Sequence, residues 1–219
     1  RKDNHNKMTF SMTYAYSEKY VLVISHDEVV HLKCSMVNKM PGYPEEKIRN
    51  LKAAYAFMLF HPGKKLLFMG QEFGQLREWS EERELDWYLL NEKPHQDLQE
   101  FVKTLLHMYT KYPALYAGDN DPDGFEWINA DDAYRSIFSL VRKSPTKRNN
   151  LLFIVNFTPV DRPDYRVGVP KKKQYKLIMN EHGPLEKPEV FKAEAQECDH
   201  REFSFDYPLP GYGVAVFTY

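Results

Sequence analysis

The sequence is poor in cysteine and in long apolar runs. Of its 219 residues only Cys34 and Cys198 are cysteines, and their separation matches no metal-binding or redox motif. We therefore expect two free thiols, which is the usual state in a reducing compartment, and predict a cytoplasmic protein. The longest apolar run, Ala53–Phe60, is too short to cross a bilayer, so neither a membrane span nor a signal peptide is expected.

Net charge is also nearly absent. The 30 basic and 31 acidic residues leave a formal charge of −1, which predicts neither nucleic acid nor an anionic membrane as a partner. Apolar residues make up 42% of the chain and aromatic residues 15%, which is enough for a sizeable core. Because the opening at Arg1 does not resemble a natural start, we expect the chain to be part of a longer protein.

Residues 1–116 alternate between strand and helix patterns. Apolar runs at Val21–Ile24 and Lys65–Met69 predict two short buried strands, the first of them covered on both faces. Helical spacing predicts three helices, which lie around Met8–Ala15, after Pro44 and before Pro113. Strand, helix, strand, helix is the order of a parallel sheet with right-handed crossovers.

Residues 117–219 lack helical periodicity and carry short β-rich runs instead. These runs are Phe125–Ile128, Ser136–Arg142, Leu151–Phe157, Tyr175–Met179, Glu202–Asp206 and Val214–Tyr219. Solvated hairpin loops are expected at 143–150 and 170–173. The spacing predicts an antiparallel β-sandwich, so the fold class is α/β followed by all-β.

The first predicted strand ends in the polar cluster Ser25-His26-Asp27-Glu28. Parallel strands place their chemistry at the carboxyl end, so this cluster predicts one wall of an active site. In the alternative interpretation, Ser25 and Glu28 form a capping box for a following helix, and His26 and Asp27 are ordinary loop residues. Two successive titratable groups are costly unless they are solvated, paired or used.

A second carboxylate, Glu72, follows the second predicted strand. Paired carboxylates suit glycoside chemistry, so Glu72 and Asp27 could face one cleft. The alternative is a turn residue that accepts backbone hydrogen bonds between Gly70 and Gly74, which the two glycines favour.

Other motifs are weaker. The Gly70–Gly74 segment lacks the Lys-Ser/Thr pair of a phosphate loop, and His26 with His31 has no third metal ligand. No metal or cofactor is therefore predicted. The three tryptophans could stack on sugar rings or belong to the core, and they are Trp79, Trp87 and Trp127.

Several segments share a wider pattern. They are Val21–His31, His61–Gln75, Arg77–Trp79, Leu85–Trp87, Pro113–Leu115, Gly124–Trp127 and Val155–Pro159. Together they resemble the bacterial 1,4-α-glucan branching enzymes of the α-amylase superfamily. The first segment is similar to the last signature motif of that family, and the second to its eighth barrel strand. The resemblance runs through nearly the whole chain and thins after about residue 170.

The resemblance implies a fold and an activity. Residues 1–116 would be the last two βα units of a (β/α)8 barrel, and residues 117–219 an all-β C-terminal domain. Enzymes of the family cut an α-1,4-glucan chain, such as glycogen or amylose, and transfer it to a 6-hydroxyl. The resulting α-1,6 branch forms by a retaining double displacement.

The resemblance also assigns residues. Asp27 matches the carboxylate that stabilises the transition state, and His26 the histidine that hydrogen-bonds the same sugar, while Glu28 and Trp79 are expected to bind substrate. The nucleophile and the acid/base belong to earlier barrel strands without a counterpart here, so we expect this chain alone to be inactive.

Departures and alternatives remain. Three residues differ from those usual in the family, namely Val23 in place of proline, Leu32 in place of glycine and Leu76 in place of tryptophan. A non-catalytic carbohydrate-binding module and an α-glucan hydrolase of the same superfamily are the alternative functions. Two isolated parallel strands leave open edges, so self-association is expected.

Overall fold

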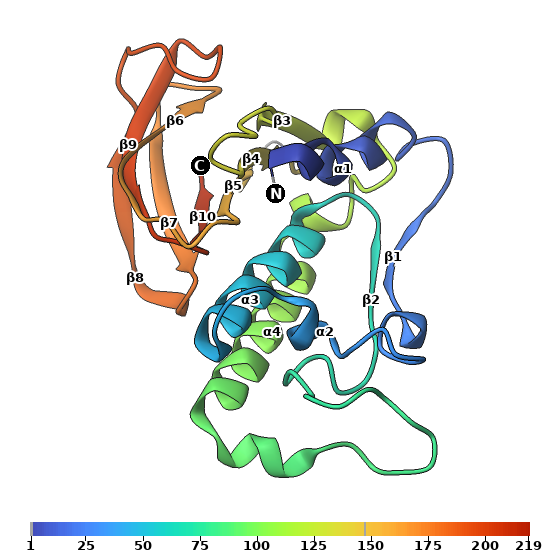
Figure 1. The fold of residues 1–219 in the computed structure, drawn as a ribbon. Helices are drawn as coiled ribbons and strands as arrows, with labels where there is room; N and C mark the ends of the chain where they lie inside the picture. The colour runs from blue at the N-terminus through green and yellow to red at the C-terminus, as the bar shows by residue number, and fades with distance from the viewer. Residues whose placement is uncertain (1, 147) are drawn as a thin grey trace.

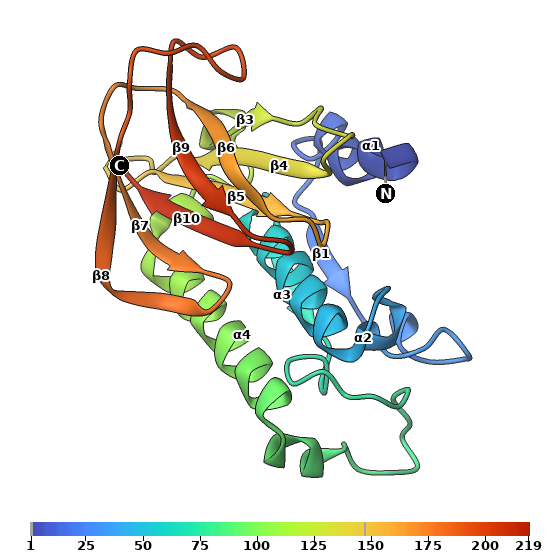
Figure 2. The ribbon, with the colours of Figure 1, turned by 60° about the vertical axis from the view of Figure 1, so that its left-hand side comes forward.

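The computed structural model describes residues 2–146 and 148–219 and arranges them in layers (Figures 1 and 2). Helices α3 (Pro44–Phe60) and α4 (Lys93–Lys111) lie between a two-stranded ladder on one side and the β-rich half on the other. Within 2–146 and 148–219 no helix is long and apolar enough to span a membrane.

The ladder is a parallel pair, β1 (Val21–Ile24) and β2 (Lys64–Leu67), joined through α3. Pro44 occupies the first turn of α3, and the Glu46 carboxylate accepts a hydrogen bond from the Tyr43 N–H at 2.9 Å. Gly63, with φ of 111°, makes the sharp turn into β2. The predicted order of strand, helix, strand, helix is confirmed, although β2 begins and ends earlier than its apolar run predicted.

The β-rich half is an antiparallel sandwich. Its larger sheet has the order β3-β4-β5-β10-β7-β8, and β6 pairs with β9 in a second sheet. The strands are β3 (Phe125–Asn129), β4 (Ile137–Arg142), β5 (Leu151–Asn156), β6 (Arg162–Val169), β7 (Gln174–Asn180), β8 (Gly183–Lys192), β9 (Phe203–Leu209) and β10 (Val214–Thr218). The predicted all-β sandwich is confirmed.

Two strands were missed by the sequence pattern. β6 contains Pro163, and β8 is a mostly exposed edge strand with Pro184 and Pro188. Proline and mixed charge are tolerated at such edges, where a strand lacks the alternation of a half-buried one.

Of the two expected hairpin loops, one is confirmed and one is wrong. Segment 143–150 joins the paired strands β4 and β5, although position 147 lies outside the described residues. Segment 170–173 instead crosses between the sheets, because β6 pairs with β9 while β7 pairs with β10 and β8.

The expected N-terminal helix is shorter than predicted. α1 covers His5–Thr9 and continues as a 3₁₀ turn over Phe10–Thr13. Its position is determined by His5, whose ring stacks on Phe138 at 4.0 Å and whose Nε2 lies 2.8 Å from the carbonyl oxygen of Ala130. A tertiary contact at its start, not helical periodicity, therefore places this segment.

The prediction that the first strand is covered on both faces is wrong. Val21 is 47% exposed and Val23 52% exposed, and Leu66 beside them on β2 is 40% exposed. Ile24 and Leu67 on the opposite face pack against the core shared with α3. The ladder is therefore covered by helices on one side only.

The six-stranded sheet is covered on both faces. On one face α3 packs against it, and the rings of Phe60 and Phe153 stack at 4.4 Å. On the other face β9 closes the sandwich, with Phe205 and Phe217 at 5.2 Å. The core therefore runs continuously across the boundary expected near residue 116.

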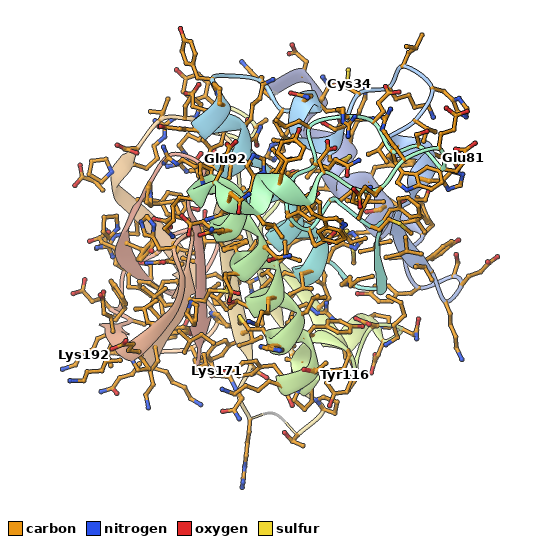
Figure 3. The ribbon with its side chains drawn as sticks, turned by 90° about the horizontal axis from the view of Figure 1, so that it is seen from below. Cys34, Glu81, Glu92, Tyr116, Lys171 and Lys192 are labelled. Carbon is orange, nitrogen blue, oxygen red and sulfur yellow. The ribbon has the colours of Figure 1, made fainter. Side chains whose placement is uncertain are left out.

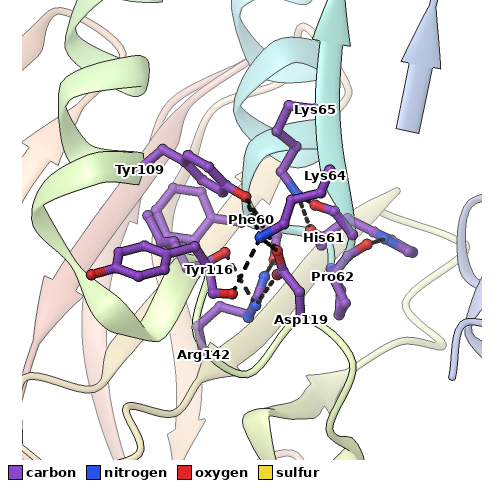
Figure 4. A network of polar contacts seen from close by, with 11 residues as sticks. Phe60, His61, Pro62, Lys64, Lys65, Tyr109, Tyr116, Asp119 and Arg142 are labelled. Atoms are coloured by element: carbon purple, nitrogen blue, oxygen red, sulfur yellow. Dashed lines mark hydrogen bonds and ion pairs between the residues drawn. The ribbon is translucent and has the colours of Figure 1, made fainter. Parts of the chain in front are cut away.

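A buried polar network joins the ladder to the sheet (Figure 4). Arg142 of β4 is fully buried, and its guanidinium bonds Asp119 at 2.7 Å and the carbonyl oxygen of Phe60 at 3.0 Å. The other Asp119 oxygen accepts hydrogen bonds from Lys64 Nζ at 3.3 Å and from the Tyr109 hydroxyl at 3.2 Å. One buried carboxylate thus connects β2, α4 and β4.

Two further bases lie in this network. Burial lowers the pKa of Lys65 to about 7 and that of His61 to about 4. His61 Nδ1 lies 2.8 Å from the Pro62 carbonyl, which can only accept, so Nδ1 carries the proton and Nε2 accepts from the Ser11 hydroxyl at 2.7 Å. Both ring nitrogens of neutral His61 therefore have a hydrogen-bond partner.

Candidate functional site

The carboxyl end of β1 forms a 3₁₀ turn over His26–Glu28. The Ser25 hydroxyl accepts a hydrogen bond from the Asp27 N–H at 3.3 Å, so the serine caps this short turn. The reciprocal bond of a capping box is replaced by another contact, because the Glu28 carboxylate lies 3.5 Å from Lys39 Nζ. The turn ends at Glu28 and no helix follows it within residues 29–35, so the capping box of the alternative interpretation is not formed.

The Asp27 carboxylate points into solvent. Its side chain is 68% exposed, and Oδ1 lies 3.4 Å from Nε2 of His26, which is 53% exposed. The Asp27 carbonyl oxygen accepts a hydrogen bond from Lys33 Nζ at 2.8 Å. The backbone of Asp27 is thus held while its carboxylate stays available to a ligand.

An open depression of about 640 Å³ lies beside this turn. His26, Val30, His31, Phe68, Trp79, Ser80 and Glu81 line it. Trp79 packs edge-on against Phe68 at 5.2 Å and against His26 at 6.4 Å. The structure thus brings His26 and Trp79 together, whereas Asp27 and Glu28 are not among the lining residues.

Figure 3 shows where the loop after β1 and the loop that carries Trp79 lie in the molecule. Cys34 and Glu81, which mark the two loops, lie on the side away from Lys171 and Lys192 of the β-rich half. The lining residues all belong to the ladder and its loops, and none of those in the described part of the chain comes from the sandwich.

A second loop holds the first in place. The Glu78 carboxylate accepts hydrogen bonds from the N–H groups of Leu32 at 3.1 Å and Cys34 at 2.7 Å, and the Trp79 N–H donates to the Val29 carbonyl at 3.0 Å. The motif Arg77-Glu78-Trp79 was noted in the sequence, but the function of Glu78 was not predicted. The nearest signal was an acidic residue beside the tryptophan expected to bind substrate.

An ion pair anchors this second loop. Arg77 Nε lies 2.9 and 3.0 Å from the two carboxylate oxygens of buried Asp86. The Arg77 guanidinium lowers the pKa of Asp86 below its usual range, so the pair stays charged at neutral pH. The chain on either side of Trp79 is thereby fixed.

Glu72 lies in the turn between Gly70 and Gly74, whose φ angles are 86° and 71°. It is half-buried, and its charge adds to burial in raising the pKa of Tyr55 on α3. This position near α3 favours the turn residue over a second carboxylate facing Asp27.

The other aromatic and metal-binding candidates fall outside the depression. Trp127 packs against Phe125 at 5.0 Å in the core, and Trp87 lies against Phe73 at 5.2 Å with half of its surface exposed. Among residues 2–146 and 148–219, no three histidine, cysteine, aspartate or glutamate side chains gather as a metal site.

Comparison with known proteins adds the family. Residues 127–219 match the model of the alpha amylase C-terminal all-beta domain. A 1,4-alpha-glucan branching enzyme, GlgB, from Butyrivibrio fibrisolvens is 49% identical over 100% of this chain and 35% of its own length. The corresponding enzyme of Aquifex aeolicus (strain VF5) is 49% identical over 82% of this chain and 29% of its own.

The chain belongs to the 1,4-alpha-glucan branching enzyme family. It spans about a third of the length of these curated relatives and corresponds to a C-terminal portion of them. The resemblance in the sequence motifs is confirmed.

Two solved structures share the fold of this chain. Pullulanase type I from Bacillus subtilis str. 168 superposes with a TM-score of 0.69 over 99% of this chain and 31% of its own, at 13% identity. The catalytic module of the pneumococcal glycogen-degrading protein SpuA gives a TM-score of 0.66 over 98% of this chain and 39% of its own, at 12% identity. At such low identity the likeness concerns the fold alone.

Proposed function

We propose that this chain is the C-terminal part of a glycogen branching enzyme, which cuts α-1,4-glucan chains and transfers them to a 6-hydroxyl. The observation that carries the proposal is the exposed Asp27 carboxylate beside His26 at the end of β1, next to a depression walled by Trp79. The 49% identity to a branching enzyme over the whole chain supports this reaction over others of the superfamily.

Asp27 is the proposed transition-state stabiliser. Retention at the sugar carbon takes two displacements, each through a transition state with positive charge on the ring. A carboxylate without a fixed cationic partner accepts hydrogen bonds from sugar hydroxyls and stabilises that charge. His26 donates a hydrogen bond to the same sugar, the flat face of Trp79 stacks on a pyranose, and Glu28 binds substrate nearby.

The remaining groups lie outside this chain. β1, α3, β2 and α4 are proposed as the last two βα units of a (β/α)8 barrel within residues 1–116, followed by the β domain of residues 117–219. The nucleophile and the acid/base then come from earlier barrel strands, so neither displacement has its reagent in the isolated chain. Assaying the 219-residue chain on amylose through its iodine complex tests this, and branching turnover would contradict it.

The Asp27 assignment is tested in the full-length enzyme that contains this chain. Asp27→Asn keeps the shape and removes the charge, so kcat should fall by about 10²–10³-fold or more while the melting temperature is retained. Asp164→Asn, at an exposed position of β6, is the matched control. Near-parental turnover of Asp27→Asn would refute the role.

The alternatives differ in their products. An α-glucan hydrolase releases reducing ends without new α-1,6 branches, and a binding module retains glycogen affinity without either product. Measuring reducing ends, branch points and glycogen binding on the same full-length sample separates the three functions.

Location and self-association complete the proposal. Exposed Cys34 and half-buried Cys198 are both free thiols, which fits a cytoplasmic location. The open face of Val21, Val23 and Leu66 favours association of isolated chains. Sedimentation of the chain tests this, and a clean monomer at micromolar concentration would contradict it.

A further inference from the structure

The loop that follows Asp27 has a costly backbone conformation. His31, Leu32 and Cys34 have φ of 55°, 65° and 67°, in the left-handed region that favours glycine. Non-glycine residues remain there only when surrounding contacts hold them. Buried Val29 and Val30 fix the start of the loop, so its far end needs a separate restraint.

The Glu78 carboxylate supplies that restraint. Oε1 accepts from the Cys34 N–H and Oε2 from the Leu32 N–H, at 2.7 and 3.1 Å. The Lys33 N–H between them donates to the Val30 carbonyl at 3.2 Å instead. The negative charge of the carboxylate strengthens both of its hydrogen bonds, so one side chain holds the two amides on either side of Lys33.

Glu78 is itself held and stands back from the depression. Its carbonyl oxygen accepts from Arg83 at 2.5 Å, and its neighbour Arg77 is paired with Asp86. Trp79, Ser80 and Glu81 line the depression, whereas Glu78 is not among the lining residues. Glu78 is therefore connected to the depression through the loop that it bonds, and it does not line the depression itself.

The loop in turn reaches the backbone of Asp27. Lys33, between the two bonded N–H groups, donates from Nζ to the Asp27 carbonyl at 2.8 Å. Releasing Glu78 would free Leu32 and Cys34 to leave the left-handed region, and Lys33 would move with them. The orientation of Asp27 thus depends on a residue 51 positions further along the chain.

We propose that Glu78 is a positioning residue, whose carboxylate bridges the Leu32 and Cys34 amides and thereby orients Asp27 and His26. This inference rests on the proposed function. The proposed function concerns groups that contact the substrate, whereas Glu78 acts through the loop and touches no substrate.

Glu78→Gln in the full-length enzyme is the test. A glutamine offers one acceptor oxygen for two N–H donors, so kcat should fall by about 10–100-fold, with KM within about threefold of the parent. Hydrogen exchange of residues 29–35 should accelerate. Glu82→Gln, on an exposed glutamate of the same loop, is the matched control and should leave kcat, KM and hydrogen exchange unchanged.

A second substitution separates positioning from direct contact. Glycine adopts positive φ readily, so Leu32→Gly in the Glu78→Gln background should restore kcat to within about threefold of the parent. Failure of this rescue would assign Glu78 to substrate contact and overturn the proposal. Unchanged kcat or unchanged exchange in Glu78→Gln would also overturn it.

The proposed function fails separately. If Asp27→Asn keeps its turnover, the catalytic assignment is refuted, and the exchange measurement alone then decides whether Glu78 holds the loop. If Asp27→Asn is inactive and Glu78→Gln is not, only the positioning role is lost.

Discussion

Two regions of this chain carry the same kind of strand sequence and bury it differently. β4 and β5 are buried at every position, whereas β1, an equally continuous apolar run, exposes Val21 and Val23. The six-stranded sheet lies between α3 and α4 on one face and the β6–β9 sheet on the other. The β1–β2 ladder has helices on one face only (Figure 1). An apolar run therefore reports what a strand can bury, and the rest of the fold decides what it does bury.

The largest expected effect lies at the seam, by which we mean the buried polar network of Asp119, Arg142, Lys64 and Tyr109 that joins the β1–β2 ladder to the six-stranded sheet. Asp119→Ala leaves Arg142 buried and unpaired, so the free energy of unfolding should fall by about 3–5 kcal/mol in urea titrations of this chain.

Asp123→Ala is the control for that measurement. Asp123 is exposed on a nearby turn, so its removal should change stability by less than about 0.5 kcal/mol. A loss below 1 kcal/mol for Asp119→Ala would show that the two regions are held together by apolar packing alone.

A matched pair of leucines tests the comparison directly. Leu140 of β4 is fully buried and Leu66 of β2 is 40% exposed. Leu140→Ala should cost about 2–5 kcal/mol of unfolding free energy, and Leu66→Ala less than about 1 kcal/mol. Equal losses in chemical denaturation would mean that the open face of the ladder is covered in solution.

Acid should weaken the seam through His61. Its folded pKa of about 4 lies below the unfolded value of 6.5, so the unfolded chain binds more protons between these values. Stability is therefore lost as pH falls from 6.5 to 4, by about 3 kcal/mol at most. His61→Gln should flatten that slope, and exposed His107→Gln should leave it unchanged.

The smallest effect concerns the loop after β1. Leu32 is 95% exposed at φ of 65°, so Leu32→Gly relieves backbone strain without removing buried surface. The chain should become about 0.5–1 kcal/mol more stable in thermal unfolding. A destabilised Leu32→Gly chain would show that the exposed leucine packs against a partner surface.

Sequence patterns predicted where helices and strands form better than they predicted which faces of those elements are buried. α3, α4, β5 and β10 follow from helical spacing and β-rich runs because those signals are local. β6 and β8 were missed, since an edge strand with Pro163 or Pro184 carries no alternation.

In the candidate site, too, the local features were predicted from the sequence and the long-range contacts were not. The polar tip at His26 and Asp27 followed from the end of an apolar run, and Trp79 from its motif. The bond between Glu78 and Leu32 joins residues 46 apart, and the pair of Arg142 and Asp119 joins residues 23 apart. No local pattern in the sequence brings such partners together.

The family, the order of the elements and the ionisable end of β1 could be read from the residues alone, because each is carried by short continuous segments. Three further features became visible only in the folded molecule: β1 is covered on one face, Glu78 bonds the loop after Asp27, and one buried carboxylate joins β2 to β4. Burial and ion pairing depend on which distant segments come into contact in the folded chain, and a local sequence pattern does not specify those contacts.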